Sequence, residues 1–260
     1  MRGISGKRII VTGGANGIGA ATARRLAEEG ALVFIGDIAE EAMKARIEEL
    51  RPIAQAAGGE MEGRAFDLAD PPSIEALIET CRERFGGLDG LANVAVDVRS
   101  SQREVGQNLL EMDPLLWERT FRVNTTGLAL TIRAAIPHMK TAGGGSIVNV
   151  SSTAGQAGAR FVPAYAASKG GVQVLTKHVA MNFGKSNIRC NTVAPGWVLT
   201  ESNRQSATIE AHDHALGTLP LTRLGDPSDV ASIITFLLSE EAAWMTGQTI
   251  GVNGGAHFSA

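Results

Sequence analysis

Residues 7–26 read KRIIVTGGANGIGAATARRL, and this stretch decides the fold of the chain. Its β-branched run at residues 9–11 is typical of a buried strand, and its alanine-rich end has helical spacing. In the turn between them, Gly13, Gly17 and Gly19 would let the backbone approach a pyrophosphate where a Cβ would clash. The unsatisfied amides and the dipole at the start of the helix favour an anion there. The stretch therefore indicates a phosphate-binding turn.

An acidic residue strengthens this interpretation, because a glycine-rich turn alone can form without any ligand. Asp37 ends the next apolar run, and an acid about 20 residues past the glycines is where a dinucleotide site places its acceptor for ribose hydroxyls. Asp37 would also repel a 2′-phosphate. Neither residues 14–16 nor Ile38-Ala39 supply the arginine or lysine that such a phosphate needs. We therefore expect NAD rather than NADP.

Tyr165 is the only tyrosine, and Lys169 follows it at the spacing that places two side chains on one face of a helix. A phenol titrates near ~10, and a cation held beside it favours the phenolate and lowers its pKa. The pair could then act as a general acid or base toward a substrate. A lone Tyr-x-x-x-Lys is more often two residues that merely share a helix face. The dinucleotide turn earlier in the chain favours the catalytic interpretation here.

Strand-like and helical segments alternate along the chain without an internal repeat or a linker. This order predicts an α/β fold, a Rossmann-like doubly wound parallel sheet with helices on both faces and its ligand at the carboxyl ends of the strands. We expect a single domain over residues 1–260. Two segments should flank the mouth of the pocket: a polar loop at residues 97–107 and a substrate-lid insertion at about residues 201–219. About seven strands are expected, and they begin near Arg8, Leu32, Gly63, Leu88, Ser146, Ile188 and Thr249.

Taken together, these residues resemble the short-chain dehydrogenase/reductase family over essentially the whole chain. The family's cofactor signature Thr-Gly-x-x-x-Gly-x-Gly matches residues 12–19, and its active-site Tyr-x-x-x-Lys matches residues 165–169. Its catalytic serine corresponds to Ser152 at the end of a strand, and its catalytic asparagine corresponds to Asn124. Later motifs of the family match at two further places, residues 195–200 and residues 246–255.

The resemblance implies a role for each catalytic residue. Tyr165 would take the proton of an alcohol whose hydride passes to the nicotinamide, and the Ser152 hydroxyl would polarise the substrate oxygen. Lys169 would lower the pKa of Tyr165 and bind the nicotinamide ribose, and Asn124 would hold a water that connects the lysine to solvent. Two alternatives stay open: Asn124 could satisfy local backbone inside a helix, and Ser152 could simply end a strand. The cofactor contacts implied are Gly13, Asn16, Gly17, Ile18, Gly19, Asp37, Ile38, Asp67, Leu68, Asn93, Ala95, Tyr165, Lys169, Pro195, Gly196, Val198 and Thr200.

The chain departs from the family after its fourth strand. There it has Asn93-Val94-Ala95-Val96 where the family usually has Asn-Asn-Ala-Gly. Val96 adds bulk where the family has none, so the resemblance does not fix the backbone geometry beside the cofactor there.

Composition argues against several classes of function. The net charge of −3 gives no basic surface for nucleic acid, and no apolar run reaches membrane-spanning length. We expect no leader segment. Cys81 and Cys190 lie far apart, which fits a reducing, cytoplasmic location without a disulfide. His212 and His214 have no third ligand near them in sequence, so we expect no metal and assign both to a solvated face.

The chain is therefore expected to be an NAD-dependent oxidoreductase that moves a hydride between the nicotinamide and a secondary alcohol or ketone. The expected pocket mouth is almost wholly apolar, which favours an apolar or cyclic substrate. Its apolar members are Val94, Val96, Ala154, Ala159, Phe161, Val162, Trp197, Leu199, Leu216 and Leu219, and its polar members are Gln156, Asn203, Arg99 and Arg160.

Two other functions remain as alternatives. Reduction of 3-oxoacyl thioesters usually runs on NADPH and needs a basic patch for an acidic carrier protein. A non-catalytic NAD-binding regulator or scaffold would be free to lose at least one catalytic residue. The resemblance also implies a homotetramer, paired across two-fold axes through the helices at residues 113–139 and 163–184.

Overall fold

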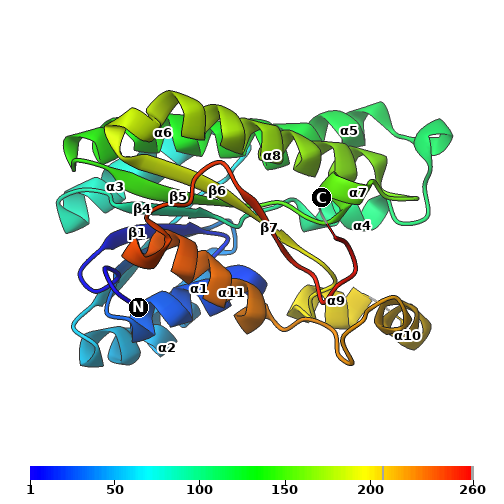
Figure 1. Ribbon diagram of the computed structural model, residues 1–260, viewed down its shortest axis with the longest axis horizontal. Coiled ribbons are helices and arrows are strands. Elements are labelled where there is room, and N and C mark those ends of the chain that lie inside the picture. Colours follow the sequence, from blue (N-terminus) through cyan, green and yellow to red (C-terminus); the bar gives the residue numbers. More distant parts are fainter. Residues whose placement is uncertain (207, 259–260) are drawn as a thin grey trace.

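The computed structural model describes residues 1–206 and 208–258, and within them seven parallel strands form one sheet covered by helices (Figure 1). The strand order is β3-β2-β1-β4-β5-β6-β7. The predicted doubly wound sheet is therefore confirmed. Leu32, Ile188 and Thr249 begin their strands as predicted, whereas the third strand begins at Glu60, ahead of Gly63. The strands are β1 (Arg8–Thr12), β2 (Leu32–Asp37), β3 (Glu60–Ala65), β4 (Gly90–Asn93), β5 (Gly145–Val150), β6 (Ile188–Pro195) and β7 (Thr249–Val252).

Helices cover both faces of the sheet (Figure 1). In β1, Ile9 and Val11 belong to the apolar core on one face, while Ile10 belongs to the core on the other. Because both faces are buried, β1 is apolar at successive positions instead of alternating. One layer holds α1 (Gly17–Glu28), α2 (Glu40–Ala56) and α11 (Pro227–Leu238), and the opposite layer holds α3 (Pro71–Phe85), α6 (Leu128–Thr141) and α8 (Pro163–Phe183).

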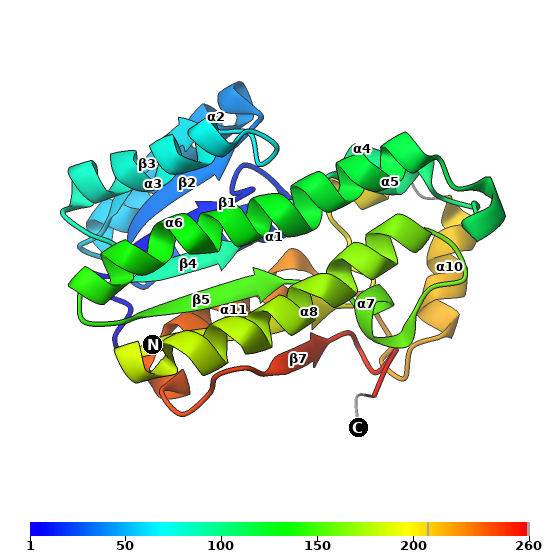
Figure 2. The ribbon, with the colours of Figure 1, turned by 90° about the horizontal axis from the view of Figure 1, so that it is seen from above.

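A long helical run lies beside α8 on the second face (Figure 2). It consists of α5 (Pro114–Phe121), the π-helical turn η2 (Arg122–Gly127) and α6. A π-helical turn inside an α-helix is rare and frequently marks a functional site. Shorter helices complete the description: η1 (Leu109–Glu111), α7 (Ala154–Ala157), η3 (Gly184–Ser186) and η4 (Glu240–Ala242).

The two segments that break the strand–helix rhythm are both helical. Residues 97–107 were expected to form a loop, but they contain the helix α4 (Val98–Arg103). The Asp97 carboxylate caps its start by accepting a hydrogen bond from the Ser100 amide at 3.0 Å. The predicted lid segment folds into α9 (Glu201–Ser206) and α10 (Ile209–Gly217). No helix in the described part of the chain is long and apolar enough to cross a membrane.

The strand order reverses at β1, which pairs with both β2 and β4. At such a switch point the loops leaving the carboxyl ends diverge and open a crevice for a ligand. Here the loops after β1 and β4 are held together, because the Thr12 hydroxyl accepts hydrogen bonds from the Val94 and Ala95 amides at 3.1 and 3.3 Å. A Cβ on Gly13 would lie only 2.8 Å from the Ala95 Cα, so glycine is required at this contact.

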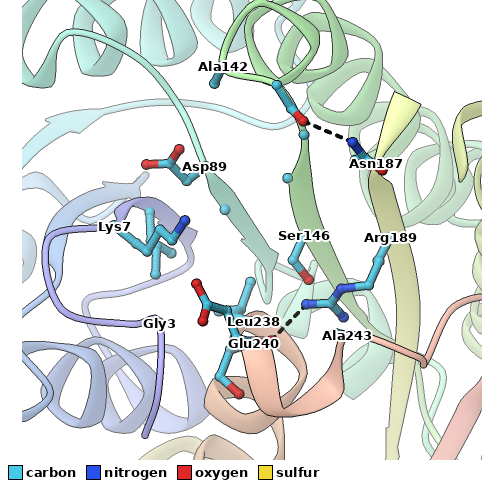
Figure 3. Close-up of a pocket in the computed structure, with 16 residues that line it drawn as sticks. Gly3, Lys7, Asp89, Ala142, Ser146, Asn187, Arg189, Leu238, Glu240 and Ala243 are labelled. Atoms are coloured by element: carbon cyan, nitrogen blue, oxygen red, sulfur yellow. Dashed lines mark hydrogen bonds between the residues drawn. The ribbon is translucent and has the colours of Figure 1, made fainter. Parts of the chain in front are cut away.

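A cavity of about 260 Å³ lies at the opposite, amino end of the strands (Figure 3). Two of the charged groups that line it already bond to the protein. Asp89 accepts from the Arg8 guanidinium at 2.7 Å, and Arg189 donates to the Ser239 carbonyl at 2.9 Å. This end of a doubly wound sheet is not where ligands bind, so we locate the functional site at the carboxyl ends.

Candidate active site

The glycine-rich turn joins β1 to α1 in a compact form. A Cβ on Gly19 would lie 1.9 Å from the Gly13 carbonyl oxygen, so a larger residue would open the turn. Asn16 is the N-cap residue of α1, yet its side chain makes no capping hydrogen bond within residues 1–206 and 208–258. The first amides of α1, which begins with Gly17 and Ile18, are therefore not capped by that side chain. A helix start of this kind fits a pyrophosphate.

Asp37 lies beside this turn at the end of β2. Its carboxylate accepts hydrogen bonds from the Ala15 amide at 3.0 Å and from the Ala39 amide at 2.9 Å. These bonds fix the carboxylate next to the glycine-rich turn and leave lone pairs for hydroxyl donors. Ile38, the next residue, is 70% exposed. The arrangement fits a ribose acceptor beside a pyrophosphate-binding turn.

Two predicted cofactor residues, Asn93 and Leu68, have side chains that are committed to contacts inside the protein. The Asn93 side chain is buried, donates to Asn149 Oδ1 at 2.9 Å and accepts from the Thr131 hydroxyl at 2.9 Å. Leu68 lies in the apolar core, so only the backbone of Leu68 or Asn93 could face a cofactor. Asp67 differs, because its half-buried carboxylate accepts from the Ala69 amide at 2.8 Å at the crevice end of the sheet.

The backbone beside the crevice keeps a close approach despite the departure at residues 93–96. Ala95 touches the glycine-rich turn through the contacts at Gly13 and Thr12 described above. Val94 packs against the core below the turn, and Val96 is half-buried. Ala95 therefore contacts the glycine-rich turn with valines at positions 94 and 96.

The segment after β6 closes the crevice from the other side. The Pro195 carbonyl accepts from the Thr153 amide at 3.0 Å, and a Cβ on Gly196 would lie 2.9 Å from the Asn253 Cα. Thr200 lies opposite the glycine-rich turn, because its Cγ2 would be 3.2 Å from a Cβ on Gly17. Val198 is buried, so its contact with a ligand would also be through the backbone. The structure thus brings the predicted residues 17 and 200 together.

Ser152, Tyr165 and Lys169 converge between β5 and α8. Ser152 follows β5, and its side chain hydrogen-bonds the Tyr165 phenol. The Lys169 ammonium lies 5.8 Å from the centre of the Tyr165 ring and donates to the Val150 carbonyl at 2.9 Å. Lys169 is only 2% exposed. A hydroxyl, a phenol and an ammonium therefore meet at the carboxyl end of β5. The helical spacing predicts this for Tyr165 and Lys169, and the family resemblance implies it for Ser152.

Asn124 lies in the π-helical turn and is buried. Its Oδ1 accepts from the Asp97 amide at 3.0 Å, and its Nδ2 donates to the Ser168 hydroxyl at 3.2 Å. The side chain therefore links the start of α4 to α8, the helix that carries Tyr165 and Lys169. Asn124 therefore connects two other helical segments, whereas the alternative role was to satisfy backbone groups within its own helix.

The pKa of Tyr165 differs from the value that its pairing with Lys169 was expected to give. Burial raises the pKa of Tyr165, and the hydrogen bond with Ser152 acts in the opposite direction. Lys169 was expected to lower the pKa of Tyr165, but its ammonium is instead held by the Val150 carbonyl. Burial lowers the pKa of Lys169 itself to about 8. Desolvation thus outweighs the hydrogen bond with Ser152, so the pKa of Tyr165 is raised and the expected lowering was wrong for the protein taken by itself.

Two residues acquire a place in the site that their sequence context did not indicate. His212 was assigned to a solvated face, yet its ring packs edge-on against Trp197, with ring centres 6.3 Å apart. Its Nε2 is buried and has no hydrogen-bond partner within the described residues. Glu104 is buried, and its carboxylate binds the first turn of α8. No short-range signal reveals either contact. The described residues contain no group of His, Cys, Asp and Glu side chains suited to a metal.

Comparison with known proteins agrees with this geometry. Residues 13–257 match the family model described as enoyl-(acyl carrier protein) reductase. The 7alpha-hydroxysteroid dehydrogenase of Bacteroides fragilis is 38% identical over 255 residues, which cover 98% of this chain and 96% of that protein. The 3-oxoacyl-(acyl-carrier-protein) reductase of Thermotoga maritima is 36% identical over 252 residues, which cover 97% and 98%. A solved short-chain type dehydrogenase/reductase from Mycobacterium ulcerans has a TM-score of 0.87 at 30% identity, covering 97% of this chain and 90% of that one.

The fold and the site define an oxidoreductase with a dinucleotide-binding crevice. The matching family model and the similar proteins show that the chain belongs to the short-chain dehydrogenase/reductase family. It is accordingly an enzyme of the kind that uses a nicotinamide cofactor, NAD(H) or NADP(H), on small-molecule substrates.

The low pKa of Lys169 predicts how stability should depend on pH. Below about pH 8 the fold holds a buried ammonium, and the shift from 10.5 to about 8 corresponds to a cost of about 3 kcal/mol. This cost fades as the pH rises to the ordinary lysine value, since the unfolded chain then loses the proton as well. The free energy of unfolding of wild type should therefore rise relative to that of Lys169→Met between about pH 7 and about pH 10. Denaturant titrations at both pH values measure it, and parallel changes in the two proteins would contradict it.

Proposed function

We propose that this protein is an NAD-dependent dehydrogenase that interconverts secondary alcohols and ketones through Tyr165, Ser152 and Lys169. The observation that carries the proposal is the Tyr165 phenol, hydrogen-bonded to Ser152 with the Lys169 ammonium behind it. A non-catalytic NAD-binding protein would have no need to keep these groups together at the crevice.

The side chains of Tyr165 and Ser152 transfer the proton and orient the substrate oxygen. The raised pKa of Tyr165 keeps the phenol protonated at neutral pH, so it can donate a proton to a ketone oxygen. The Ser152 hydroxyl polarises the same oxygen. Oxidation of an alcohol needs the phenolate, so its rate should increase toward alkaline pH. Bound nicotinamide supplies or accepts the hydride.

Asp37 supports NAD over NADP as the cofactor. A 2′-phosphate beside this carboxylate would be repelled, and the exposed Ile38 offers no positive charge. Arg46 also reaches the turn, where its Nε donates to the Ala15 carbonyl at 3.3 Å. Its guanidinium pairs with Glu49, which reduces its capacity to bind a phosphate.

Replacing Asp37 with Ser and Ile38 with Arg should shift the preference toward NADP. The removed repulsion and the added cation–phosphate pair predict a change in the ratio of kcat/KM values of about tenfold to a thousandfold. Steady-state kinetics with NAD and NADP on wild type and on the double variant measure this ratio. A wild-type enzyme that already prefers NADP would refute the proposed role of Asp37.

We also propose an apolar, cyclic alcohol as the substrate and the α9–α10 segment as the lid over it. The expected pocket mouth includes exposed apolar side chains, with Phe161 at 42%, Trp197 at 39% and Leu216 at 36% exposure. Such side chains favour a largely hydrocarbon ligand. The Bacteroides fragilis relative acts on a hydroxysteroid by name, whereas the Thermotoga maritima relative is a 3-oxoacyl reductase. Arg99, expected as a polar lining residue, has a side chain outside the described residues.

A substrate panel tests this choice. With NAD, cyclic and aromatic secondary alcohols should give higher kcat/KM than sugars, polyols and hydroxy acids, because the apolar lining offers little to their polar groups. NADH absorbance follows each reaction. Faster turnover of a 3-oxoacyl thioester with NADPH would favour the alternative function instead.

Assembly as a homotetramer is a further part of the proposal. Val174 and Met181 lie two helical turns apart on the outer side of α8, with exposures of 68% and 78%, and Leu115 on α5 is 74% exposed. A second copy would bury these side chains across a two-fold axis. Light scattering should give four times the 27.2 kDa chain mass, and a monomer alone would contradict it. The buried thiols Cys81 and Cys190 support a cytoplasmic location, which fractionation of the source cells would test.

A further inference from the structure

The catalytic helix α8 begins without a cap from its own sequence. Val162 occupies the N-cap position with φ 59° and ψ 54°, a left-handed conformation that a β-branched residue rarely adopts. Its side chain has no acceptor for the unpaired amides of the first turn. The hydrogen-bond acceptors for these amides must therefore come from another part of the chain.

Glu104, which directly follows α4, supplies the missing acceptors. Its Oε1 accepts from the Ala164 amide at 3.1 Å, and its Oε2 accepts from the Tyr165 amide at 3.1 Å. Glu104 is 2% exposed, and no ion pair to a cation is found for it in the described part of the chain. The positive end of the helix dipole and two charge-assisted hydrogen bonds compensate this buried carboxylate.

The helix that carries Glu104 is itself anchored to the site. The Asp97 carboxylate caps α4 and also accepts from the Arg119 Nε at 2.8 Å. The Asp97 amide donates to Asn124 Oδ1, and Asn124 reaches the Ser168 hydroxyl on α8. The start of α4 is thus fixed to Asn124, and its end is fixed to Tyr165.

We propose that Glu104 is a positioning residue for Tyr165, an inference that rests on the proposed role of this phenol in proton transfer. The amide that Glu104 binds is that of Tyr165 itself, so loss of the carboxylate frees the turn that aims the phenol at Ser152. Lys169, one turn later, remains held by the Val150 carbonyl at 2.9 Å and by the Ser151 hydroxyl at 2.8 Å. We therefore expect loss of the Glu104 carboxylate to displace only the first turn of α8.

The test compares wild type with Glu104→Ala, Glu104→Gln and the control Asp113→Ala. Asp113 is an exposed N-cap whose carboxylate accepts from the Leu115 amide at 2.9 Å on α5, so its loss removes a comparable cap away from Tyr165. Glu104→Ala should lower kcat roughly tenfold to a hundredfold, the effect of a small misplacement of a reacting group. NADH affinity, measured by fluorescence, should stay within about twofold because the glycine-rich turn is untouched. Glu104→Gln keeps one acceptor oxygen, so its kcat should lie between that of Glu104→Ala and that of wild type.

A purely structural role gives a different pattern. Glu104→Ala would then show a lower melting temperature with kcat close to that of wild type, as expected for Asp113→Ala, and the proposal would be overturned. If Glu104→Ala does not fold, Glu104→Gln decides: unchanged kcat overturns the proposal, and reduced kcat with unchanged NADH affinity supports it. Wild type without activity on any secondary alcohol would instead show that the proposed function itself fails, and the role of Glu104 with it.

Discussion

The close contact between helix α8 and the end of β5 is the constraint on which the rest of the site depends. Lys169 accepts from the Ser151 hydroxyl through its carbonyl and donates from its ammonium to the Val150 carbonyl, so backbone and side chain are both fixed to the strand end. A Cβ on Gly155 would lie 2.7 Å from the Lys169 carbonyl carbon, so only glycine allows this approach. This contact buries the Lys169 ammonium, and the burial lowers its pKa. Perturbed pKa values of this kind are typical of functional sites.

A chain of buried polar groups ties this contact to the middle of the sheet. Asn149 on β5 accepts from Asn93 on β4 and donates to the Thr176 hydroxyl on α8 at 2.9 Å. Thr192 on β6 donates to the same hydroxyl at 2.7 Å. Because each member has partners, the chain specifies how α8 and the three strands align at little net cost. It also explains why Asn93, at the edge of the crevice, turns its side chain into the core.

The features that short spacings encode could be predicted from the sequence. The glycine-rich turn, Asp37 and the Tyr165–Lys169 pair each depend on residues close together in the chain, and the structure brings them to one edge of the sheet. The cap that Glu104 provides could not be predicted, since it joins residues about sixty positions apart with no local pattern. The direction of the Tyr165 pKa was missed for a similar reason: desolvation depends on what surrounds the phenol, which the sequence does not state. The helix α4 was missed because its polar composition concealed the cap at Asp97.

The central claim is that the Tyr165 phenol exchanges the proton during turnover. The most direct measurement is kcat of Tyr165→Phe with a secondary alcohol and NAD, together with NADH affinity of the same variant. Loss of the hydroxyl should lower kcat by about a thousandfold or more, the upper range for a general acid–base residue, while NADH binds nearly as in wild type. Substantial turnover by Tyr165→Phe would contradict the account.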